Sequence, residues 1–130
     1  MKHSKHIYFI LYGILLPLFL GVAIYFYKLN SNIAIPNWVK YNLPDGLWTF
    51  SFTSFILCIW GKDKSKLRKT LWIATPIVVS FAFEFSQLWI TVGTFDTSDL
   101  LWYASCYASS TALYLLTKQK MNFMKHKPPD

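Results

Sequence analysis

The chain has 130 residues, the length of one domain, of which 54% are hydrophobic and 19% aromatic. Only 15% are charged, whereas an average soluble domain carries about 25% charged residues. This composition argues against a soluble domain and favours a chain surrounded by lipid, even though the net charge of +7 alone would suit a nucleic-acid partner.

The apolar stretches predict an all-α polytopic membrane protein, a single domain over residues 1–130 built as a bundle of four transmembrane helices. We expect spans at about 7–27, 45–61, 71–90 and 99–117. The first has roughly 21 uncharged residues, enough to cross a hydrocarbon core of about 30 Å. No clean cleavage site follows it, so we expect a retained anchor rather than a signal peptide. Pro17 predicts a kink within this span.

The basic residues predict the orientation of these spans. Two lysines precede the first span, five basic residues lie in the loop 62–70, and four lysines lie in the tail 118–130. Only Lys28 and Lys40 lie on the other side. The positive-inside bias therefore puts both termini and the loop 62–70 in the cytoplasm of a multi-pass cell-membrane protein. Attraction to anionic lipid explains the basic loop, and we expect no nucleic-acid partner.

The two cysteines lie within apolar runs. With spans two and four running in the same direction, Cys58 and Cys106 differ in depth by roughly 9 Å at 1.5 Å per residue. A disulfide needs Cα atoms within about 7 Å of each other. We therefore expect both thiols to be free.

Four of the six acidic residues gather on the outer side in this topology. Asp45 opens the second span, and Asp96 and Asp99 precede the fourth, while Glu84 lies roughly 9 Å below the outer end of the third span. A carboxylate within a span is costly unless it has partners or a task. These acids predict either a carboxylate-lined pocket open to the outer face or, more simply, helix caps and a buried packing contact.

The third span also carries a polar stripe. Its members are spaced by four, three and four residues, which places Ser80, Glu84, Gln87 and Thr91 on one helical face. The fourth span repeats small residues at Ala104, Ala108 and Ala112, a pattern that lets two helices approach closely. We expect spans three and four to form a tight hairpin through a loop around Gly93.

Three motifs resemble the VanZ-like family of small bacterial membrane proteins. They are Leu43-Pro44-Asp45-Gly46-Leu47-Trp48, then Glu84-x-x-Gln87, then Gly93-Thr94-Phe95-Asp96-x-x-Asp99. The resemblance covers about residues 42–116 and implies a helical protein of the bacterial cell envelope. The founding member is linked to resistance toward the glycopeptide teicoplanin, and no molecular activity is established for the family. Many relatives carry an arginine ahead of the aspartates; this chain lacks it, so no cation lies near these acids in the sequence.

The candidate binding set combines the acids, the polar stripe and one tryptophan: Asp45, Trp48, Ser80, Glu84, Gln87, Thr91, Asp96 and Asp99. All three histidines fall on the cytoplasmic side, so we expect no metal site and no cofactor at the acids. The leading hypothesis is a pocket that binds an envelope lipid or a lipoglycopeptide and contributes to antibiotic or envelope-stress resistance, in a monomer or a homo-oligomer.

Two alternatives stay open. One is a membrane enzyme acting on a lipid or isoprenoid headgroup, with Asp96 and Glu84 as a general acid and base. The other is a structural or accessory subunit whose acids serve only helix packing.

Overall fold

A computed structural model describes residues 7–30, 34–90 and 94–125, and all regular secondary structure in these ranges is helical, which confirms the all-α prediction. The elements are a π-helical turn η1 (Leu11–Leu15), α2 (Leu16–Asn30), the short α3 (Asn37–Lys40), α4 (Asn42–Trp60), α5 (Lys66–Ser86) and α6 (Thr97–Lys125).

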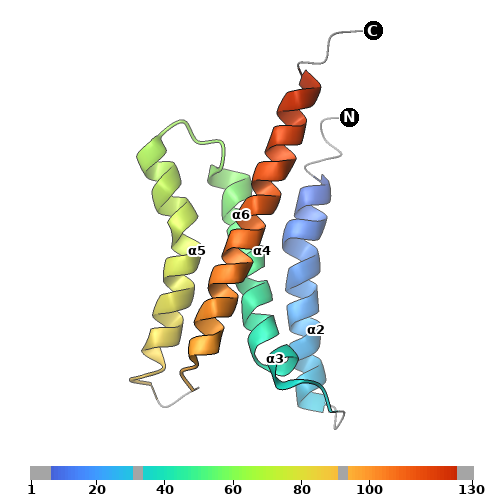
Figure 1. Ribbon diagram of the computed structural model, residues 1–130, viewed down its shortest axis with the longest axis vertical. Coiled ribbons are helices and arrows are strands. Elements are labelled where there is room, and N and C mark those ends of the chain that lie inside the picture. Colours follow the sequence, from blue (N-terminus) through green and yellow to red (C-terminus); the bar gives the residue numbers. More distant parts are fainter. Residues whose placement is uncertain (1–6, 31–33, 91–93, 126–130) are drawn as a thin grey trace.

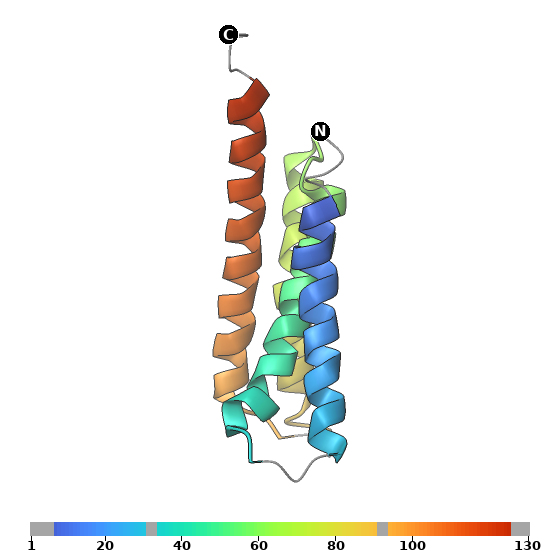
Figure 2. The same cartoon turned by 90° about the vertical axis from the view of Figure 1, so that its right-hand side faces the viewer.

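The four long helices run alternately up and down (Figure 1). The start of η1, the connection between α4 and α5, and the end of α6 lie at one end of the bundle, which we call the basic end. The end of α2, the short α3, the end of α5 and the start of α6 lie at the opposite end (Figures 1 and 2), which we call the mouth end. The predicted outer acids belong to the mouth end.

Helix α4 is the centre of the bundle, because it packs against every other element. Its buried residues include Ile56 and Leu57 but also four hydroxyl side chains, those of Thr49, Ser51, Thr53 and Ser54. The Ser54 hydroxyl lies 2.8 Å from that of Ser110 on α6, and the Thr49 hydroxyl lies 2.9 Å from that of Ser80 on α5. Ser51 donates to the backbone oxygen of Ile14 on η1 at 3.0 Å. Small hydroxyl residues let helices approach closely and join them by hydrogen bonds.

The distribution of polarity is the reverse of that in a water-soluble bundle. Buried polar and charged residues outnumber buried hydrophobic ones among the described residues; the polar set is Asn42, Thr49, Ser51, Thr53, Ser54, Ser80, Glu84 and Ser110. Large apolar side chains instead cover the outside of all four long helices, for example Phe19, Ile59, Phe83 and Leu101. Apolar surface this extensive marks contact with lipid or with other protein.

One helix in the described chain, Ile7–Leu29, is long and apolar enough to cross a membrane by length and composition, with a mean hydropathy of 2.4. Signal sequences and buried core helices have the same length and composition, so this helix alone identifies no membrane protein. At the predicted kink, the N–H of Leu16 bonds to Leu11 O, five residues back, just before Pro17. Pro17 has no N–H to donate, and a wider turn accommodates its ring.

The predicted packing of the fourth span is wrong. Ala104, Ala108 and Ala112 are exposed, and α6 makes its main contact with α4 rather than with α5. The close approach is made instead at Gly46 of α4, where an added Cβ would lie 2.9 Å from the Cys106 sulfur. A small-residue repeat marks a smooth helix face but does not determine which partner covers that face.

The helices also extend beyond the predicted spans. Helix α5 begins at Lys66, within the predicted basic loop, after Ser65 caps it by accepting from the N–H of Arg68 at 3.4 Å. It ends at Ser86, so Gln87 lies in the following turn. Helix α6 continues to Lys125, through much of the predicted tail. Both cysteines are free, as predicted.

Candidate functional site

Glu84 is completely buried where α5 meets α6 and the segment before α6. Its Oε1 accepts the backbone N–H of Asp96 at 2.8 Å. Its Oε2 accepts from the Gln87 amide at 3.3 Å and from the Tyr103 hydroxyl at 3.4 Å. A buried carboxyl group with three donors is satisfied rather than stranded, and here it ties two helices to the segment between them.

A cavity of about 560 Å³, which we call the mouth, opens at the end of the bundle where α2, α3, α4 and α6 meet. It is lined by Tyr25, Lys28, Asn37, Lys40, Tyr41, Asn42, Pro44, Asp45, Gln87, Thr94, Asp96 and Asp99. This volume lies within the range of small-molecule sites, roughly 300–1,000 Å³. Three carboxylates and two ammonium groups contribute to the lining, so the mouth carries both signs of charge.

The two lysines of the mouth converge on one aromatic ring. The Lys28 ammonium lies 4.2 Å from the centre of the Tyr41 ring, and the Lys40 ammonium lies 5.5 Å from it. Lys28 lies in the last turn of α2, and Lys40 is the last residue of α3. Cation–π attraction of this kind holds an ammonium group in place without neutralising its charge.

The three aspartates of the mouth differ in how they are held. Asp99 accepts from the Asn42 amide at 2.6 Å, and Asp96 accepts from the N–H of Ser98 at 2.8 Å, as a helix cap does. Asp45 faces the cavity, and among the described residues its carboxylate forms no hydrogen bond or salt bridge with protein. Its negative charge is therefore available to a ligand.

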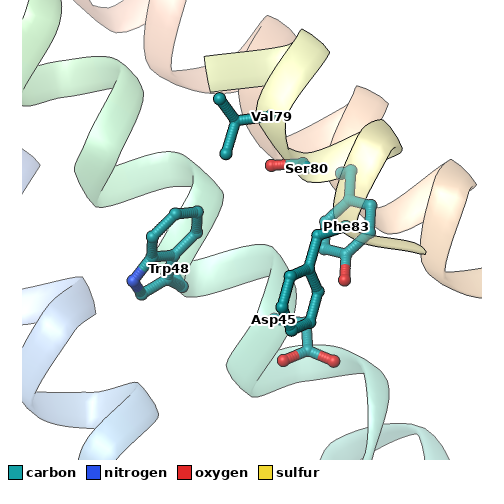
Figure 3. Close-up of a pocket in the computed structure, with 6 residues that line it drawn as sticks. Asp45, Trp48, Val79, Ser80 and Phe83 are labelled. Carbon is teal, nitrogen blue, oxygen red and sulfur yellow. The ribbon is translucent and has the colours of Figure 1, made fainter. Parts of the chain in front are cut away.

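A second cavity of about 250 Å³, which we call the chamber, lies between α4 and α5 and shares Asp45 with the mouth. Asp45 and Trp48 line it from α4, and Val79, Ser80 and Phe83 line it from α5 (Figure 3); Tyr103 of α6 completes it. Apart from Asp45 and the hydroxyl groups of Ser80 and Tyr103, its walls are apolar. A polar mouth and an apolar chamber thus meet at one carboxylate.

The predicted site residues divide between these places. Asp45, Gln87, Asp96 and Asp99 line the mouth, and Asp45, Trp48 and Ser80 line the chamber. Glu84 lines neither cavity. Thr91 and Gly93 lie outside the described residues.

The predicted site omitted several contributors, among them Lys28, Lys40, Tyr41, Asn42 and Tyr103. Lys28 and Lys40 supply the cations that the sequence lacks beside the acids, and they were already identifiable as the only lysine or arginine residues outside the segments predicted to be cytoplasmic. Asn42 and Tyr103 precede and follow the predicted motifs by a few residues, and nothing in their spacing marked them.

The geometry gives no support to an acid–base pair of Glu84 and Asp96. Glu84 bonds to the backbone of Asp96, while the Asp96 carboxylate bonds to the N–H of Ser98. Within the described residues, no group of three or more metal-ligating side chains comes together. The arrangement is instead suited to binding, through opposite charges that face one cavity.

Comparisons of the chain with protein-family models, with curated proteins and with solved structures find no match.

Proposed function

We propose that this chain is a four-span membrane protein of the bacterial cell envelope whose outward-facing mouth binds an amphiphile, either an envelope lipid or a lipoglycopeptide. Its resemblance to the VanZ-like family agrees with this proposal and extends it to antibiotic or envelope-stress resistance. The termini and the α4–α5 connection would face the cytoplasm.

The polarity of the bundle supports the membrane setting. Hydroxyl-lined helix contacts inside and phenylalanine, leucine and isoleucine outside are the arrangement expected in lipid, which offers no hydrogen bonds to polar side chains. The basic loop residues gather at one end of the bundle, away from Asp45, Asp96 and Asp99, as the positive-inside bias requires. Stacked tryptophan pairs near both ends agree with interfacial belts (Trp38 with Trp102, and Trp60 with Trp72).

The observation that carries the binding function is that Asp45 lines both the mouth and the chamber. A headgroup needs a polar, charged cavity, and its hydrocarbon chain needs an apolar cavity beside it. The two cavities adjoin at a carboxylate that forms no hydrogen bond or salt bridge among the described residues.

Topology is tested by single cysteines introduced at Lys40 and Lys64 in a Cys58→Ser/Cys106→Ser background. An impermeant maleimide added to intact cells should label the cysteine at position 40 and leave the one at position 64 unlabelled. Equal labelling of both, or the reverse pattern, would overturn the orientation.

Ligand binding is tested by native mass spectrometry of purified protein with its co-extracted lipids. Wild type and the basic-end control Lys64→Gln should retain a bound amphiphile, whereas Asp96→Asn and Asp45→Asn should retain less at equal abundance. If all four proteins retain the same amount of amphiphile, the mouth is not the binding site.

A second candidate, a structural or accessory subunit, is favoured by one observation: Glu84 uses both oxygens for packing and lines neither cavity. It predicts that substitution of the mouth aspartates changes abundance or thermal stability without changing lipid retention.

A further inference from the structure

From the distribution of charge around the mouth, we infer the chemical class of its ligand: a lipid with a zwitterionic headgroup, in which a phosphate is bound by Lys28 and Lys40 and an amine by Asp45 and Asp99. This inference rests on the proposed amphiphile-binding function and adds the identity of the headgroup.

The anion-binding half of the mouth is formed by α2 and α3. The Lys28 and Lys40 ammonium groups come from different elements and both lie against the Tyr41 ring, at 4.2 Å and 5.5 Å from its centre. Among the described residues, neither lysine forms a salt bridge with an aspartate of the mouth. Two cations that lie against one ring and line one cavity, neither held in a salt bridge within the described chain, form a site for a group with several anionic oxygens, such as a phosphate diester.

The cation-binding half is formed by α4 and α6. Asp45 forms no hydrogen bond or salt bridge with the described residues, and Asp99 has one oxygen bonded to Asn42 at 2.6 Å, which leaves its second oxygen available. Asn42 and Asp45 both belong to the first turn of α4, so the Asn42–Asp99 bond draws the start of α6 toward Asp45. A primary ammonium group has three donors and suits two carboxylates and a neighbouring carbonyl or amide oxygen.

A lipid explains the site better than a soluble zwitterion, because the chamber continues from Asp45 between α4 and α5. Trp48, Val79 and Phe83 give it apolar walls. Phe83 is also 67% exposed on the outside of the bundle, so the chamber lies beside a surface that faces lipid in the proposed setting. A hydrocarbon chain can therefore leave the mouth through this gap without crossing water.

The test compares short-chain lipids for binding to the purified full-length protein in detergent, with quenching of tryptophan fluorescence as the readout. The probes are phosphatidylethanolamine, phosphatidylglycerol and diacylglycerol of equal chain length, together with free phosphoethanolamine. We expect phosphatidylethanolamine to bind about tenfold more tightly than phosphatidylglycerol, the effect of one charge-assisted hydrogen-bonded group. Diacylglycerol and free phosphoethanolamine should bind more weakly still.

Two sets of variants separate the halves of the site. Asp45→Asn should lower the affinity for phosphatidylethanolamine to the level of phosphatidylglycerol and leave phosphatidylglycerol unaffected. Lys28→Gln/Lys40→Gln should weaken both phospholipids and leave diacylglycerol unchanged. The matched controls, Asp63→Asn and Lys64→Gln at the basic end, should bind as wild type does, and thermal midpoints of all variants report whether they fold.

Each outcome separates the two proposals. Asp45→Trp would fill the place where mouth and chamber adjoin. If all three lipids bind wild type equally and this variant binds none of them, the headgroup inference is wrong and the proposed amphiphile-binding function stands. Free phosphoethanolamine that binds as tightly as the lipid overturns the choice of a lipid. If no variant of the mouth or the chamber alters lipid binding, the proposed function itself is wrong.

Discussion

The mouth end and the basic end of the bundle are built from the same kinds of contact but differ in what their charges do. Each end has one tryptophan pair with nearly parallel rings. The ring centres of Trp38 and Trp102 at the mouth end are 5.7 Å apart, and those of Trp60 and Trp72 at the basic end are 5.0 Å apart. Each end also places a cation over an aromatic ring, Tyr41 or Trp60.

At the basic end the one described acid is neutralised. Asp63 accepts from two nitrogens of the Arg68 guanidinium, at 2.6 Å and 3.0 Å, in a pair that lies at the surface. At the mouth end, ammonium groups and carboxylates line one cavity without forming such a pair among the described residues. Charges that are paired serve local structure, whereas charges left facing a cavity are available to a ligand. Four changes test this difference.

The largest effect on stability is expected from Glu84→Ala at the mouth end. It leaves the Asp96 N–H, the Gln87 amide and the Tyr103 hydroxyl without their acceptor, which should lower the free energy of unfolding by about 3 kcal/mol. Denaturation with sodium dodecyl sulfate in mixed micelles measures this. Val78→Ala, on an exposed face of the same helix, is the control. A loss no greater than in the control would show that Glu84 does not hold the mouth end together.

Gly61→Ala should destabilise the basic end by about 2 kcal/mol, because the new methyl group overlaps the Tyr114 hydroxyl and the backbone oxygen of Leu57. Lipid binding at the mouth should be unchanged. Gly21→Ala is the matched control, since its methyl group meets nothing closer than 3.5 Å. A parallel loss of lipid binding in Gly61→Ala would mean that the two ends are not independent.

The two tryptophan pairs provide a sharper comparison. Trp38→Ala and Trp72→Ala each remove one stacked ring, and each should cost about 1 kcal/mol of stability. Only Trp38→Ala should also weaken phospholipid binding, because Trp38 anchors the short α3 that carries Lys40. Titration of both variants with the same phospholipid measures the difference. If the two variants bind the lipid with equal affinity, α3 does not contribute to the binding site.

The smallest effect is expected from the ion pair at the basic end. The Arg68 guanidinium beside Asp63 holds the pKa of that carboxyl below its usual range. Because the folded-state pKa is depressed, the stabilisation is present above the ordinary aspartate pKa of about 4 and is lost as the pH falls through the lower folded value. Thermal midpoints of wild type and Asp63→Asn should therefore differ slightly at pH 7 and converge in acid. A difference that grows on acidification contradicts this assignment.

Much of the architecture was predictable from composition and periodicity. The all-helical class followed from the long apolar runs. The separation of Asp45, Asp96 and Asp99 from most basic residues followed from their order along four antiparallel segments. The stripe of Ser80 and Glu84 on a buried face of α5 is also as predicted, since a spacing of four residues places two side chains on one face.

The rest depended on how the helices rotate and pack, which spacing does not determine. The sequence by itself placed Asp45, Asp96 and Asp99 at one end, because alternating helices bring the second and fourth starts together. Only the tertiary structure decided that α6 turns its alanines outward and Tyr103 inward, and that Glu84 uses its carboxylate oxygens in hydrogen bonds between helices. It also decided that Lys28 and Lys40 both lie against the Tyr41 ring, because the rotation of each helix and the path of α3 depend on contacts between residues that are distant in the sequence.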